Sequence, residues 1–186
     1  MKTTSEVFTL PARVLHWLMA AMILAMLFIG VGMVASVSER HAWLLGIHKP
    51  LGIAILVLAL LRLAMRLRHP PPPLPVDLPA MQRLAAHASH GLLYALMIAM
   101  PLVGWAMLSA GGYPVMLGEA LQLPAIVPAN ATAFAILRHL HSWLAMALLL
   151  TFLAHLAAAL YHSLVRRDGV LPSMLGTRKR PWQNGS

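Results

Sequence analysis

The sequence predicts an all-α integral membrane protein, a four-helix bundle in which each helix crosses the bilayer. Of its 186 residues, 60% are apolar, whereas soluble domains average about 45–50%. Only 10% of the residues are charged. The apolar residues gather in four long segments, each near the ~20 residues that a helix needs to span a membrane. We therefore expect a single membrane domain over residues 1–186.

The four expected helices differ in their boundaries and internal features. The first has no charged residue between Arg13 and Glu39, and its apolar run exceeds the about 7–15 residues of a signal peptide. Pro101 is expected to kink the third helix. The fourth has no Asp, Glu, Lys or Arg between Arg138 and Arg166. The expected helices cover residues 14–37, 43–65, 84–110 and 134–164.

The connections differ in composition. The stretch RLRHPPPPLPVDLP, between the second and third helices, is expected to be extended and polyproline-like. The stretch GGYPVMLGEALQLPAIVPANAT, between the third and fourth helices, is expected to lie on the membrane surface with a short helix of its own. Residues 168–186 form a polar tail that ends in GTRKRPWQNGS, and this end is expected to be unstructured.

The basic residues predict the orientation in the membrane. Eleven of the 14 Lys and Arg residues would lie on one side of the bundle, which should be the cytoplasmic side. Both termini are therefore expected in the cytoplasm. These eleven are Lys2, Arg13, Arg62, Arg66, Arg68, Arg83, Arg166, Arg167, Arg178, Lys179 and Arg180; the other side carries Arg40, Lys49 and Arg138.

The composition also excludes several functions. The chain has no cysteine, which removes disulfides, iron–sulfur clusters and the C-x-x-C-H attachment of c-type haem. The formal net charge of +9 could indicate nucleic acid. Here, however, the basic residues flank apolar segments, so we expect the lipid bilayer as the partner and no nucleic acid.

Histidines inside the expected helices are candidates for function, because an ionisable group in a membrane is costly and needs a partner. His141 and His155 are fourteen residues apart in the fourth helix. A helix places them about 21 Å apart along its axis and only ~40° apart in direction. One helix thus presents two imidazoles on nearly one face at opposite membrane depths.

Each of these imidazoles has a candidate partner at its own depth. His16 lies near the inner end of the first helix, level with His155, and His48 lies near the outer end of the second, level with His141. Two imidazoles per site in an apolar bundle are typical of b-type haem, held through its iron. The sequence predicts two stacked b haems with the axial pairs His16–His155, inner, and His48–His141, outer.

Other residues are weaker candidates for cofactor binding. Gly52, one turn after His48, would let a porphyrin approach the backbone. His87 and His90, at the inner end of the third helix, are alternatives to His16 as ligands, or could line the inner haem or a quinone pocket. His162 could contact haem propionates or relay protons. His41 and His69 are expected in loops, and His139 is expected at the surface.

The chain resembles the bacterial cytochrome b561 family, four-helix di-haem cytochromes linked to quinone. The resemblance rests on RVLHWLMA, GIHKPLGIAILVLALLRLAMRL, AHASHGLLYALMIAMPLVGW and LHSWLAMALLLTFLAHLAAALYH, which together cover most of the chain. It implies the same four histidine ligands, a place in the bacterial inner membrane, and electron exchange with ubiquinone or ubiquinol. It also implies an oxidoreductase that takes electrons from periplasmic superoxide.

Two other functions stay open from the sequence. The first is a haem b membrane subunit that passes electrons from a larger dehydrogenase or hydrogenase, as a redox partner protein, to quinone. The second is a histidine-lined metal transporter without haem. For the superoxide-linked function that the resemblance implies, Lys49, next to His48, and Arg138, three residues before His141, are candidates for attracting a small anion such as superoxide to the outer haem.

Overall fold

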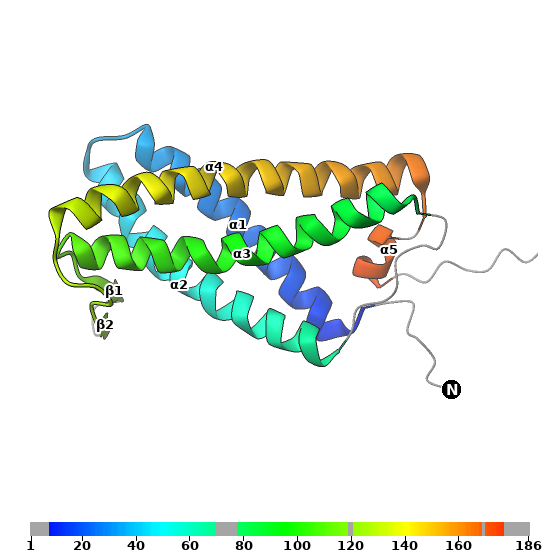
Figure 1. Ribbon diagram of the computed structural model, residues 1–186, viewed down its shortest axis with the longest axis horizontal. Helices are drawn as coiled ribbons and strands as arrows, with labels where there is room; N and C mark the ends of the chain where they lie inside the picture. The colour runs from blue at the N-terminus through cyan, green and yellow to red at the C-terminus, as the bar shows by residue number, and fades with distance from the viewer. Residues whose placement is uncertain (1–7, 70–77, 119–120, 169, 177–186) are drawn as a thin grey trace, which may run out of the picture.

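A computed structural model describes residues 8–69, 78–118, 121–168 and 170–176. Four long helices run roughly along one axis (Figure 1). All four are long and apolar enough to cross a membrane, so the predicted four-helix membrane bundle is confirmed. The observed helices are α1 (Leu10–Val34), α2 (Glu39–Arg68), α3 (Ala80–Ala110) and α4 (Ala131–Tyr161).

The helices begin three to four residues before the apolar segments that predicted them, because local sequence signals lie outside those segments. Pro11 stands in the first turn of α1, where its fixed φ favours a helix and its missing N–H is not needed. The Asn130 side chain caps α4 by accepting a hydrogen bond of 2.9 Å from the Ala133 N–H. Such a cap satisfies one of the unpaired donors at a helix start.

The outward faces of the helices are apolar. Phe28 on α1 is 71% exposed and Trp143 on α4 is 74% exposed. In water such side chains would be a liability, but in a bilayer they contact lipid, while the helices satisfy their own backbone hydrogen bonds. The pattern therefore fits a chain whose solvent is the membrane.

The connection between α3 and α4 differs from the prediction. The described residues form two short antiparallel strands, β1 (Val115–Leu117) and β2 (Leu121–Leu123), with Met116 opposite Gln122, and no short helix. The prediction of a short helix here was therefore wrong. Each of the two paired segments has only three residues, which is less than one turn of an α-helix. Gly118 follows β1 with a φ of 65°, a conformation that glycine adopts without strain and that reverses the chain.

The opposite end of the bundle carries more structure than the predicted polar tail. α4 continues into a π-helical turn, η1 (His162–Arg166), and Arg167 then adopts a left-handed φ of 52°. A short helix, α5 (Val170–Leu175), follows and returns to the start of α1, where the Trp17 indole N–H donates to the Met174 carbonyl at 3.2 Å. The proline run, residues 70–77, and residues 177–186 lie outside the described residues.

The helices pack as two pairs, α1 with α2 and α3 with α4, joined through α2 and α3. The buried cluster comprises Met19 and Ile23 of α1, Ile55 and Ala59 of α2, and Met97 of α3. Ala59 is fully buried, so α2 approaches its neighbours most closely there. Along the bundle, this cluster lies between the level of His16 and the level of His48.

Candidate functional site

The two ends of the bundle are called outer and inner after the orientation that the sequence predicts. The outer end brings together His48 of α2 and His141 of α4. Their ring centroids lie 6.1 Å apart, with the ring planes at 66°. Both side chains are mostly buried. The two residues are 93 positions apart in the sequence, so only the packing of the helices explains their approach.

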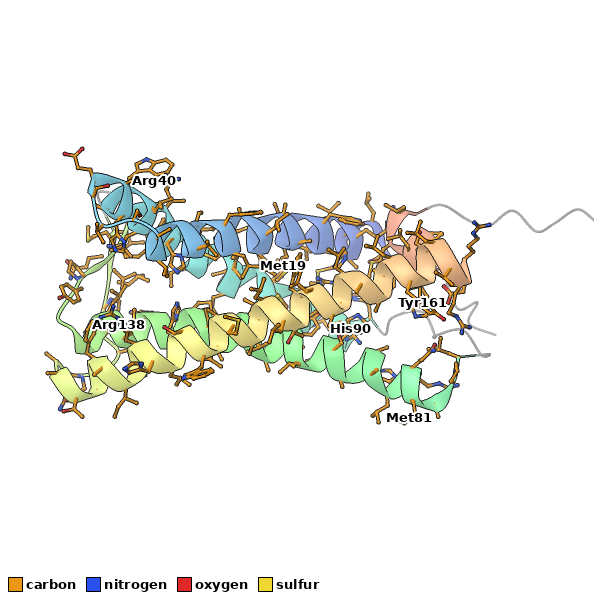
Figure 2. All side chains as sticks on the ribbon, turned by 90° about the horizontal axis from the view of Figure 1, so that it is seen from above. Met19, Arg40, Met81, His90, Arg138 and Tyr161 are labelled. Carbon is orange, nitrogen blue, oxygen red and sulfur yellow. The ribbon has the colours of Figure 1, made fainter. Side chains whose placement is uncertain are left out.

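The inner end brings together His16 of α1 and His155 of α4, whose ring centroids lie 6.4 Å apart at 74°. A third imidazole, that of His90 on α3, lies 5.3 Å from His155. The Ser89 hydroxyl lies 3.5 Å from Nδ1 of His155. Figure 2 shows His90 between α3 and α4, towards the end of the bundle that carries Met81 and Tyr161.

The spacing of the two pairs fits two imidazoles on opposite sides of one metal ion. An imidazole nitrogen lies about 2 Å from a bound transition metal, which separates the two ring centroids by roughly 6 Å. The observed 6.1 Å and 6.4 Å agree with this value. The 5.3 Å between His90 and His155 is too short, which favours His16 over His90 as the partner of His155.

Some ring nitrogens of these histidines lack the hydrogen bond that a buried imidazole normally makes. Nδ1 of His16 and of His48 is buried and has no hydrogen-bond partner among the described residues, whereas the His141 ring is close to the Met100 backbone. A buried polar group without a partner is costly, so native proteins rarely keep one without a reason. A cofactor held by these rings would account for imidazoles that are kept in the interior.

The helices that carry each histidine pair are not close neighbours in the bundle. α4 contributes to both pairs, yet its backbone packs mainly against α3 and much less against α1 or α2. The two histidines of each pair therefore meet across helices that lie farther apart than the closely packed pairs α1–α2 and α3–α4. Among the described residues, no three His, Cys, Asp or Glu side chains gather as ligands of one ion, so a zinc-type site of three or four protein ligands is not formed there.

The backbone of α3 comes close to the His141 ring of the outer pair. A Cβ atom placed on Gly104 of α3 would lie 3.2 Å from Cε1 of His141, closer than ordinary carbon contacts of about 3.5–4.0 Å. Glycine therefore lets the imidazole lie against α3. The sequence does not point to Gly104, because the small residues with a fixed relation to a histidine, such as Gly52, stand on the same helix as that histidine. The Cβ position of Gly52 instead contacts Met26, at 3.7 Å.

The remaining predicted residues lie at the ends of the bundle. The Lys49 ammonium donates to the Pro114 carbonyl at 3.5 Å. Arg138 is exposed and lines a shallow surface hollow with His139 and Ser142. His87 is exposed. Figure 2 shows Arg40 and Arg138 at the same end of the molecule.

His162 has a protein partner that the sequence did not predict. Its Nδ1 lies 2.5 Å from the Asp168 carboxylate, which also accepts a hydrogen bond of 3.1 Å from Arg166. Burial raises the pKa of Asp168, but the hydrogen bonds from His162 and from the Val170 N–H outweigh burial and hold the pKa below its ordinary value. A contact of His162 with haem propionates stays a prediction.

Comparison with known proteins identifies the family. Residues 7–177 match the profile of the family described as prokaryotic cytochrome b561. The chain belongs to the prokaryotic cytochrome b561 family. It is also 32% identical to cytochrome b561 homolog 2 of Escherichia coli (strain K12) over 179 residues, which cover 93% of each chain.

Membership of the cytochrome b561 family defines the general activity. The protein is a multi-pass membrane cytochrome b that transfers electrons, and b-type haem is its cofactor. The two histidine pairs are the places in the bundle whose spacing and unpaired nitrogens fit that cofactor.

Proposed function

We propose that this protein carries single electrons across the bacterial inner membrane, from superoxide at the periplasmic face to the ubiquinone pool. Two b haems would be held by His48 with His141 at the outer site and by His16 with His155 at the inner site. Both termini would lie in the cytoplasm. The observation that carries the proposal is the pair of imidazole contacts, at 6.1 Å and 6.4 Å, at opposite ends of one bundle.

Haem bound in this way supplies a reversible one-electron couple. The residues of the chain determine how that couple is used. Two imidazoles at each site would hold the haem without a vacant position for oxygen, which would favour electron transfer over oxygen activation. His141 and His155 belong to one continuous helix, so their separation of about 21 Å along the axis is fixed by α4.

The apolar cluster between the sites has a role of its own. Met19, Ile55 and Met97 are almost fully buried, and they separate the inner pair from the outer pair. Such packing excludes water from the interior. Protons and superoxide are thereby kept on their own sides of the membrane, while an electron can pass between the sites.

The outer face has the charge that an anionic donor needs. Lys49 adjoins His48 in sequence, and Arg138 stands one turn before His141 on α4. A positive surface beside a low-dielectric site can raise the association rate of an anion by 10–10³-fold, and the effect falls with ionic strength. Superoxide is a small anion and a one-electron donor, so it fits this surface.

Stopped-flow reduction by superoxide tests the proposal. Removing both charges, by Lys49→Gln with Arg138→Gln, should slow reduction of the outer haem by about 10-fold or more at low salt and flatten its salt dependence. Arg68→Gln, an exposed arginine at the other end of α2, is the matched control and should have no effect. Equal rates in the wild type and the double variant, at low and high salt, would rule out electrostatic attraction of superoxide.

A further inference from the structure

Two arginines in the last two turns of α2 are less exposed than the arginine at its end. Arg62 and Arg66 are both partly buried, whereas Arg68, at the end of the helix, is exposed. Arg62 stands six residues before Arg68, about 9 Å deeper along the helix. A charged side chain at such a depth is costly, and natural chains retain one mainly where it has a partner.

The described part of the chain supplies only a weak partner for these charges. The guanidinium carbons of Arg62 and Arg66 each lie 5.9 Å from the centre of the Tyr94 ring. Cation–π contacts of this kind offset part of the cost of burial but do not neutralise a charge. In the described part of the chain, no carboxylate lies within ion-pair distance of either arginine; Asp168 is paired with His162 and Arg166.

The two arginines lie at the depth of the inner histidine pair. Arg62 is close enough to both His16 and His155 to interact with them electrostatically. Arg62 and Arg66 are likewise close to His90. Arg62 therefore flanks the inner pair on the α2 side and Arg66 lies beside His90, and among the described residues neither arginine has an acidic partner.

We infer that Arg62 and Arg66 bind the two propionate carboxylates of the inner haem. The inference rests on the proposed haem site at His16 and His155. An arginine guanidinium binds a carboxylate through two parallel hydrogen bonds, so two guanidiniums match two carboxylates. Tyr94 beneath both groups would hold them in a common orientation. Phosphate oxygens of a lipid head group have similar chemistry, and the experiment separates the two sources.

Potentiometric titration of the purified protein, followed in the haem absorption bands, tests the inference. A positive charge beside a haem favours the ferrous state, so Arg62→Gln and Arg66→Gln should each lower the midpoint potential of the inner haem. The outer haem should not change. Arg62→Lys keeps the charge and should restore most of the potential. Arg68→Gln, exposed on the same helix, is the control and should leave both potentials as in the wild type.

Reconstitution with haem dimethyl ester identifies the partner. The ester lacks carboxylates, so Arg62→Gln should release natural haem from the inner site faster than the wild type does but should release the ester at the wild-type rate. Loss of the inner haem from Arg62→Gln, with retention in Arg62→Lys, would also support the inference. An inner potential that is insensitive to both arginines would overturn it, as would faster release that persists with the ester and varies with the content of anionic lipid. A wild-type protein without haem would instead refute the proposed function.

Discussion

The contact between Gly104 and His141 allows a sharp test of how the outer site is built. In Gly104→Ala, the new methyl group would lie 3.2 Å from Cε1 and 3.5 Å from Nδ1 of the His141 ring. Ordinary carbon contacts are about 3.5–4.0 Å, so the ring or α3 has to move by at least about 0.3 Å. Bonds to a bound metal tolerate only about 0.2 Å. A single methyl group should therefore disturb the outer ligand.

The size of the effect follows from the cost of overpacking. Adding a methyl group to a packed interior costs about 1–3 kcal/mol, which corresponds to roughly 5–150-fold in a binding constant. We expect the outer haem to be lost faster from Gly104→Ala by a factor in this range. The inner haem should be retained as in the wild type, because Gly104 contacts only the outer pair.

Transfer of haem to apomyoglobin measures this loss. The measurement is cleanest in a His155→Ala background, where the outer haem alone should remain. Gly46→Ala on α2 is the matched control, since a Cβ atom at Gly46 has no neighbour within 4 Å. If Gly104→Ala released its outer haem no faster than Gly46→Ala, then α3 would not position His141 and the reasoning would be wrong.

Two further predictions concern the ends of the bundle. Alkaline phosphatase fused after Ser186 should be inactive because the C-terminus is expected in the cytoplasm, and periplasmic activity would reverse the topology and exchange the two haem sites. Asp168→Asn should increase hydrogen exchange of α5 at neutral pH, because Asp168 accepts the Val170 N–H. Since its carboxyl pKa is lowered in the fold, the wild-type protection should persist above about pH 4 and disappear as the pH falls through the folded pKa. Equal exchange in both proteins at pH 7 would show that Asp168 does not hold α5.

The sequence predicted the helices and the histidine pairs for a simple reason. The bilayer requires about 20 apolar residues per span, and a helix has a fixed rise and rotation. Depth alone therefore matched His16 with His155 and His48 with His141, and the structure brings these rings together. Whether they bind iron stays a prediction.

The remaining features depend on tertiary packing. The rotation of α3 about its axis, which places Gly104 against His141, is set by contacts with neighbouring helices. The docking of α5 needs a left-handed residue, Arg167, and a hydrogen bond from Trp17 to Met174, residues 157 positions apart. The hairpin that replaces the expected loop helix depends on pairing between strands of three residues. No local pattern predicts such contacts.

The haem content of histidine variants tests the central claim most directly. A pyridine haemochrome assay on purified protein should give two haems per chain for the wild type and for His90→Ala. It should give about one haem per chain for each of the four ligand variants, His16→Ala, His48→Ala, His141→Ala and His155→Ala. If any of these four variants kept both haems, or if His90→Ala lost one, the assignment of the two pairs would be contradicted.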